Sequence, residues 1–349
     1  MSRNVTRRLA TWTAESLERA AGDTGDRIRW TRHPVGAVLL AWDPALARRA
    51  ARELASHLAL VAPRSRLVLV DNRGAGMDWA EDEGFELVSG DNSAREFSGL
   101  QRGIEHVLAS GIPSCWILAN DRYQPNRQSL LPFVDGGTLD AVTATGALAG
   151  RINGYPTPSR AFGLTVDSWA CSNFLVVAGT SLALLGSLVT VGTPELTLVV
   201  NHSVTEGPLL QGDGPLDDAL IGYLTEWLTG VGTALTDHWY RHRPATADSW
   251  DDLCGKVQSI LNEQLLSAKA RRAGIPVLPL ASAYALGGFE PTSLSYRLLA
   301  AAVRALPRQS PRLLGGLAGR NLVAMHRWHQ RRRLPTAPAL ECPSEGGAA

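Results

Sequence analysis

The stretch "CWILAND" at residues 115–121 decides the fold class. Apolar residues end abruptly in Asn120, Asp121 and Arg122, as expected of a buried strand whose carboxyl end meets polar surroundings. Three earlier apolar runs predict further strands: "VGAVLLAW" (35–42), "RLVLVDN" (66–72) and "FELVSGDN" (85–92). Helices are predicted at 44–60, after the first of these strands, and at 93–111, before "CWILAND". This alternation predicts an α/β fold with a mainly parallel sheet flanked by helices. Ligands bind at the carboxyl ends of such strands, although turns after strands are also polar for conformational reasons.

The composition is that of an ordinary globular protein, with 45% hydrophobic and 19% charged residues in 349. The net charge of +1 is unevenly distributed, because residues 297–333 hold nine Arg and no acidic residue. This segment predicts a helical basic extension that contacts an anionic membrane surface, or a solvated basic face packed on the main domain. We expect no nucleic-acid partner, since no recognition module accompanies the charge.

Compartment and membrane topology follow from three features. The four cysteines have no metal-type spacing, which favours reduced thiols. The N-terminus lacks the apolar core of a signal peptide, so we expect a cytoplasmic protein, either free or associated with the membrane surface. Residues 168–194 carry no charge, but their Gly, Ser and Thr residues favour a buried strand followed by a buried helix over a membrane span.

Three separated stretches resemble the family-2 glycosyltransferases of the GT-A fold, above all members that act in bacterial polysaccharide biosynthesis. They are "LVLVDNRG" (67–74), "LANDRYQP" (118–125), which is similar to a local form of the Asp-x-Asp motif, and "NEQLLSAKARRAGIPV" (262–277). The resemblance implies transfer of a hexosyl or deoxyhexosyl group from a UDP-, dTDP- or GDP-linked donor to a hydroxyl of a glycan or lipid-linked acceptor. It also implies inversion by a single displacement.

The resemblance divides the chain into five parts. A helical lead-in (1–34) precedes a nucleotide-sugar-binding half (35–140) and an acceptor-binding half (141–285) that carries a predicted helix at 251–273. The basic helical extension (286–334) and a disordered tail (335–349) follow.

The resemblance assigns donor binding to Asp71, Arg95, Asn120, Asp121 and Arg122. Asp71 would hold the nucleotide base, although a carboxylate there also suits a turn. Arg95 would approach the diphosphate from the first turn of the helix at 93–111, where backbone amides favour anions, or lie on an exposed face. Arg122 would add positive charge beside Asp121, or be a solvated turn residue. Ser93 and Glu96 have the spacing of a capping box.

The resemblance also implies a divalent metal, Mg²⁺ or Mn²⁺, bound by Asp121. Ala119 replaces the first Asp of the motif, and a single carboxylate makes a weak cage. His238 in "DHWYRH" (237–242) is a supplementary ligand, or an ordinary polar histidine.

Glu263 matches the position of the family's catalytic base, where Asp is usual. On a helical wheel it lies opposite the apolar positions Val257, Leu261 and Leu265. That placement fits a base that faces a cleft and takes the acceptor's proton, and it equally fits a surface Glu.

Other functions compete with this one. A non-catalytic nucleotide-sugar-binding or scaffold protein on the same fold is the main alternative, because the first motif Asp is missing and Asn262-Glu263 departs from the family's motif. A nicotinamide-dependent enzyme would need Gly-x-Gly-x-x-Gly after the first strand, where "AWDPALA" stands. A nucleotidyltransferase would need a Gly-rich basic loop at the same place.

Overall fold

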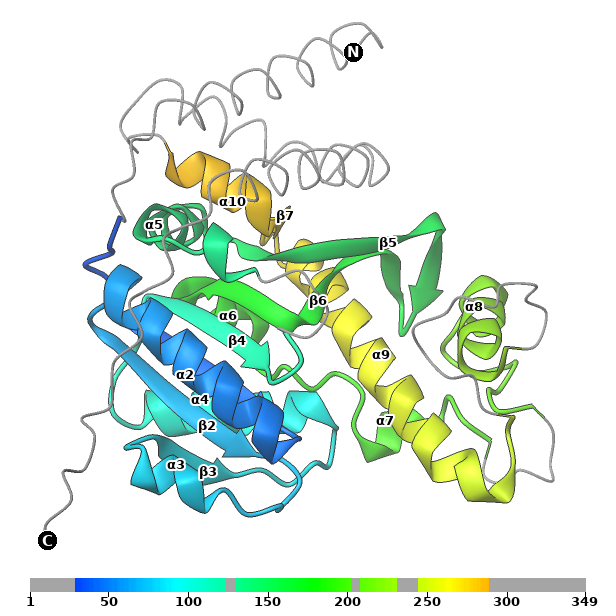
Figure 1. Ribbon diagram of the computed structural model, residues 1–349. Helices are drawn as coiled ribbons and strands as arrows, with labels where there is room; N and C mark the ends of the chain where they lie inside the picture. The colour runs from blue at the N-terminus through cyan, green and yellow to red at the C-terminus, as the bar shows by residue number, and fades with distance from the viewer. Residues whose placement is uncertain (1–28, 124–129, 202–207, 231–243, 289–349) are drawn as a thin grey trace, which may run out of the picture.

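A computed structural model describes residues 29–123, 130–201, 208–230 and 244–288 (Figure 1). The predicted lead-in up to residue 28, His238, the basic segment 297–333 and the tail 335–349 lie outside these residues.

One sheet of seven strands organises this part of the chain, in the order β3-β2-β1-β4-β6-β5-β7. Strands β3, β2, β1 and β4 pair in parallel, β6 is antiparallel to both β4 and β5, and β7 is parallel to β5. The strands are β1 (Val35–Ala41), β2 (Ser65–Asp71), β3 (Glu86–Ser89), β4 (Cys115–Asn120), β5 (Leu148–Ala161), β6 (Leu164–Ala178) and β7 (Val277–Pro279). Only β6 therefore runs against the rest, and the predicted mainly parallel α/β sheet is confirmed.

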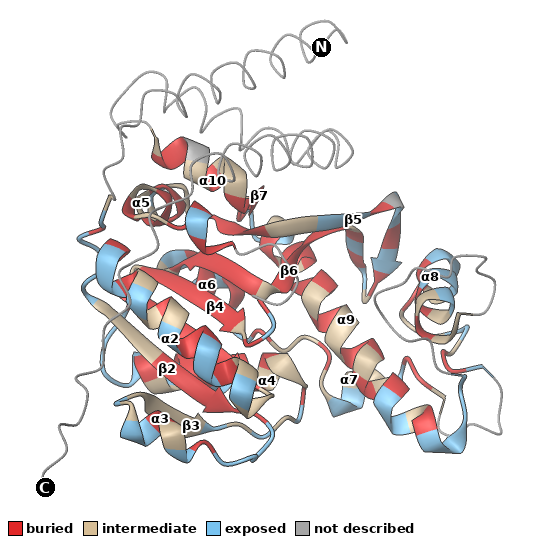
Figure 2. Ribbon diagram, viewed as in Figure 1, coloured by how far each residue is buried: buried red, intermediate tan, exposed pale blue. Residues whose placement is uncertain are grey.

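The central strands are apolar on both faces because helices cover both (Figure 2). One core cluster joins the sheet to α2, α5 and α10, and a second joins it to α4, α6 and the C-terminal half of α9. The α-helices are α2 (Pro44–Val61), α3 (Asp78–Asp82), α4 (Glu96–Leu108), α5 (Gly136–Thr145), α6 (Gly179–Leu185), α7 (Thr193–Thr197), α8 (Asp218–Thr229), α9 (Trp250–Arg272) and α10 (Leu280–Gly287), with short 3-10 turns at Leu131–Phe133 and Ala247–Ser249.

The uncharged stretch at 168–194 forms the end of β6, α6 and part of α7. The strand is buried as predicted, whereas α6 buries one face and leaves Leu184 70% exposed. None of the helices in the described ranges is long and apolar enough to cross a membrane. Cys115 and Cys171 are buried and Cys254 is half-buried, all as free thiols.

Helix starts show where local sequence rules hold and where they fail. Asp43 caps α2 through its carboxylate, which accepts bonds from the amides of Ala45 and Leu46, and Pro44 follows it. The capping box predicted for α4 is wrong. Ser93 instead donates to Asp91, and the helix begins at Glu96 after a residue with φ of 54° and no side-chain cap.

The β5–β6 hairpin reaches past the carboxyl ends of the parallel strands. β4 pairs with β6 only as far as Ala119 opposite Phe174, so the β6 residues before Phe174 extend beyond β4. A third core cluster packs this overhang against α8 and α9. Figure 1 shows α9 running diagonally from the lower right of the view to β7.

Candidate functional site

Asp121 stands where the sheet changes its direction of winding. β1 lies between β2 and β4, and the carboxyl ends of strands at such a change of winding are the usual ligand position in α/β sheets. Asp121 is 1% exposed, and its Oδ2 accepts bonds from the backbone amides of Trp42 and Asp43, both at 2.6 Å. Burial raises the pKa of Asp121, and these two bonds act to lower it. Its carboxylate thus ties the end of β4 to the turn after β1.

Asp71 organises the loop after β2. Its Oδ1 accepts bonds from the amides of Arg73, Gly74 and Ala75 at 2.8–3.3 Å, and its Oδ2 accepts from Gly76 at 3.1 Å. A carboxylate has about four acceptor positions. A direct bond from Asp71 to a nucleotide base would therefore compete with this loop.

Arg95 lies against α9. Its Nη2 donates to the carbonyl oxygen of Asp251 at 3.4 Å, and its guanidinium occupies the space that a side chain at Gly255 would fill. The loop that carries Arg95 is held by Asn72, whose Nδ2 donates to the Arg95 carbonyl at 2.9 Å. Arg95 thus connects the β3–α4 loop with the first turns of α9.

Two further side chains, those of Arg73 and Asn120, lie at or just after the carboxyl ends of β2 and β4. The Arg73 guanidinium lies 5.8 Å from the Trp42 ring centroid, so the loop after β2 stacks on the loop after β1. Asn120 is half-buried, and its Oδ1 accepts a bond from the amide of Arg122, whose side chain is exposed.

Glu263 faces β6, and this corrects the helical-wheel interpretation. The Glu263 side chain lies on a packed side of α9, so it is not an ordinary surface residue. Its Oε2 accepts bonds from the Ser172 hydroxyl at 2.7 Å and from the Ser172 amide at 3.1 Å. Ser172 has no partner in β5, because a register shift leaves 171–174 unpaired on that side, and it lies beyond the end of β4, whose last pair with β6 is Ala119–Phe174. Its amide therefore needs an acceptor, which Glu263 provides.

Burial raises the pKa of the half-buried Glu263, and the bonds from Ser172 act to lower it. The negative charge of Glu96 raises it further. Glu96 itself accepts a bond from the Ser259 hydroxyl at 2.6 Å, one turn before Glu263 on α9. A carboxyl group with a raised pKa is a better proton acceptor once ionised, as a general base requires.

The described residues do not form a complete metal cage. They contain no group of three or more His, Cys, Asp and Glu side chains able to hold an ion. Asp121, the one motif carboxylate, already binds two amides through Oδ2. His238, the predicted supplementary ligand, lies outside the described residues.

The structure brings Asn120, Asp121 and Arg122 to the same edge as the Glu263–Ser172 pair. Asp121 lies two residues after Ala119, and Ser172 lies two residues before Phe174, the partner of Ala119 in the antiparallel pairing. Sequence reasoning missed Ser172, because its role depends on an irregularity in strand pairing that leaves no local pattern. It also missed Trp42, which ends one predicted strand, and Arg73, which directly follows another.

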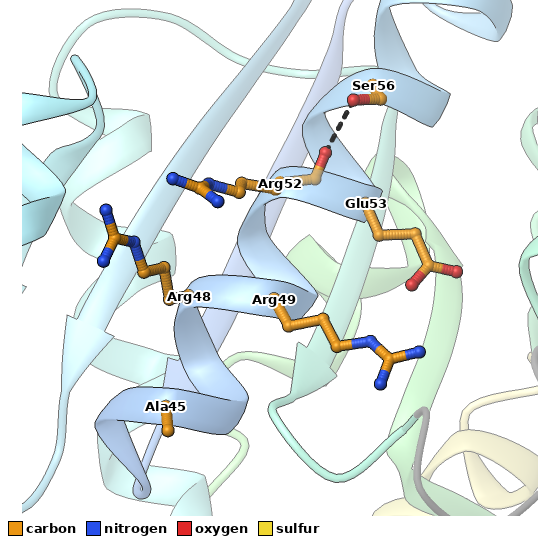
Figure 3. Close-up of a pocket in the computed structure, with 6 residues that line it drawn as sticks. All are labelled: Ala45, Arg48, Arg49, Arg52, Glu53 and Ser56. Carbon is orange, nitrogen blue, oxygen red and sulfur yellow. Dashed lines mark hydrogen bonds between the residues drawn. The ribbon is translucent and has the colours of Figure 1, made fainter. Parts of the chain in front are cut away.

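A hollow on the outer face of α2 lies apart from these residues (Figure 3). It is lined by Ala45, Arg48, Arg49, Arg52, Glu53 and Ser56. Arg48 and Arg52 both pair with Glu83 at 2.6 Å, which neutralises part of its positive charge. None of the predicted site residues lines it.

Comparisons with known proteins give distant likenesses to solved structures alone. No protein-family model and no curated protein matches this chain. A solved structure that resembles it is the mannosyltransferase PcManGT from Pyrobaculum calidifontis in complex with GDP-Man and Mn²⁺. The TM-score is 0.31 and the sequence identity 14%, over 93% of this chain and 95% of the other. A likeness at this level carries no argument about the function of this chain.

Proposed function

We propose that this protein is a glycosyltransferase, which moves a sugar from a nucleotide-diphosphate donor to a hydroxyl acceptor with inversion at the anomeric carbon. One observation carries the proposal: strand pairing brings the end of β4, with Asp121, to the same edge as Ser172, which binds Glu263. Two stretches that resemble one enzyme family, far apart in the sequence, thus meet at the edge where α/β sheets bind ligands.

The donor would lie across the turns after β1, β2 and β4. Asp71 shapes the loop that faces the base through its four amide bonds, so we assign it a positioning role. Trp42 offers a half-buried ring beside this loop. Asn120, Asp121 and Arg122 would border the diphosphate and the transferred sugar.

Transfer would take place between the end of β4 and α9. The acceptor oxygen bonds to the anomeric carbon as the bond from that carbon to the phosphate oxygen breaks, and the electron pair of the broken bond stays on the departing diphosphate. Glu263 takes the proton of the acceptor hydroxyl, and Ser172 holds its carboxylate in place. The diphosphate needs positive charge or hydrogen-bond donors nearby.

The alternative, a nucleotide-sugar-binding protein without catalysis, is favoured by one observation: the carboxylates of Asp71 and Asp121 both bind backbone amides, as structural residues do. It predicts donor binding without turnover.

The test is calorimetric titration with UDP, dTDP and GDP, each with and without Mn²⁺, followed by transfer assays with the nucleotide sugars of whichever binds. Binding of one nucleotide together with transfer to a glycan or lipid-linked acceptor is expected. No binding at millimolar nucleotide would overturn the proposal. The pairs with and without Mn²⁺ decide whether a metal contributes.

A further inference from the structure

Arg151 occupies an unusual place in the sheet, opposite the irregular part of β6. β5 pairs with β6 at Gly150–Leu175 and again at Ile152–Ala170, so Arg151 alone faces the four residues 171–174. Such bulges redirect side chains and are frequent beside active sites. The irregularity lies level with the end of β4, because Ala119 is the partner of Phe174.

The Arg151 side chain is half-buried, and its Nε is buried without a hydrogen-bond partner. Within the described part of the chain it makes no ion pair. Asn173, in the facing segment of β6, likewise has a buried Oδ1 without a partner. Burying a polar group without a hydrogen-bond partner costs free energy. The Arg151 Nε donor and the Asn173 Oδ1 acceptor are both buried without partners at one bulge, which indicates that a ligand binds there.

The Cys171 thiol, which forms a side-chain hydrogen bond with Arg151, does not compensate the charge of the guanidinium. Burial raises the pKa of the Cys171 thiol to about 12, although Arg151 itself acts to lower it. The thiol is therefore neutral at physiological pH.

Other arginines near this edge are already engaged or lie in water. Arg73 stacks on Trp42, and Arg95 bonds to the Asp251 carbonyl oxygen. Arg122 is exposed, where water weakens its electrostatic effect. A half-buried guanidinium acts more strongly on a nearby anion, and its planar shape matches phosphate oxygens.

We propose that Arg151 binds the diphosphate of the donor and stabilises the charge that forms on it as the sugar leaves, while Asn173 accepts a bond from a hydroxyl of the transferred sugar. The inference rests on the proposed function and names the residues that meet the leaving group. Arg151 of β5 and Asn173 of β6 lie level with the end of β4 along the strands, in the order β4, β6, β5 across the sheet.

The test uses inorganic pyrophosphate as the probe, titrated by calorimetry against the full chain. Loss of a charge-assisted bond predicts that Arg151→Met weakens pyrophosphate binding by about 10- to 100-fold. Arg49→Met, at an exposed position on α2, removes the same charge and should change the affinity less than about twofold. Equal affinity of Arg151→Met and wild type would overturn the inference, as would an equal loss in both variants.

A second measurement on the wild-type chain covers the case in which Arg151→Met does not fold. Phenylglyoxal modifies arginine side chains, and peptide mass spectrometry reports each site. Pyrophosphate should protect Arg151 and leave Arg49 reactive; modification of Arg151 at the same rate with and without pyrophosphate overturns the inference. Binding of neither pyrophosphate nor any nucleotide overturns the proposed function as well, whereas nucleotide binding with unprotected Arg151 overturns this inference alone.

Discussion

Glu263→Gln separates the proposed base from a purely structural carboxylate. In the wild-type chain the Oε2 atom of Glu263 accepts bonds from the Ser172 hydroxyl at 2.7 Å and from the Ser172 amide at 3.1 Å. The side-chain oxygen of a Gln at this position can accept both bonds. Burial disfavours the charged form of Glu263, so a neutral amide should leave the melting temperature unchanged or raise it. Removing a positioned proton acceptor costs about 10²- to 10⁴-fold in kcat, or about 3–5 kcal/mol in the barrier.

The assay combines three measurements on one preparation: donor affinity by calorimetry, kcat from release of the nucleotide diphosphate, and thermal unfolding. The matched control is Glu105→Gln, an exposed α4 residue whose carboxylate accepts a bond from Gln101 at 3.0 Å. We expect a large loss of kcat with donor affinity intact in the first variant and no change in the control. Unchanged kcat in Glu263→Gln would refute the reasoning and leave Glu263 as the acceptor for the Ser172 amide.

Three other predictions use the same measurements. Ser172→Ala removes a bond that lowers the pKa of Glu263, so the acid limb of the kcat/KM profile should move to higher pH; an unmoved limb would assign it to another group. Gly255→Ala should displace the Arg95 guanidinium from α9, because an added methyl group overlaps it, so the gain of about 0.5–1 kcal/mol expected from helix propensity should not appear in thermal unfolding; a full gain would contradict the packing of Arg95 on α9. Bonds from Arg66 lower the pKa of Glu86 to about 2, against 4.5 for the free group. The ionised Glu86 therefore contributes its full stabilisation above pH 4.5, and this contribution is lost as the pH falls towards 2. Glu86→Gln should therefore unfold with a weaker pH dependence in that window, as urea titrations at pH 5 and pH 3 would show, and equal slopes would contradict the ion-pair explanation.

Most of the parallel half of the sheet could be predicted from the sequence, because the information is local. Apolar runs set β1, β2 and β4, and an Asp-Pro pair starts α2. The helix predicted at 251–273 is α9, Trp250–Arg272. Each of these follows from side-chain spacing within one element.

The rest depends on contacts between distant segments. No periodicity within 164–178 shows that β6 runs against its neighbours or skips pairing at Ser172. The capping box fails because Ser93 bonds to Asp91, while Glu96 bonds to Ser259 far along the chain. For the site residues, the sequence predicted that Asp71 and Asp121 end strands, but not that backbone amides bind them. Their roles in donor binding stay predictions.

β6 pairs with β4 but is synthesised well after it, and this order has a consequence for folding during biosynthesis. Until β6 emerges, β4 is an edge strand, and its segment "CWILA" is apolar and uncharged, which is the composition that promotes intermolecular strand pairing. The ribosome must add roughly 60 further residues before β6 can cover it, which takes about 3–12 s at ordinary elongation rates. A nascent chain that stalls within this interval should aggregate or recruit a chaperone, whereas one that stalls once Ala178 has left the ribosome should not.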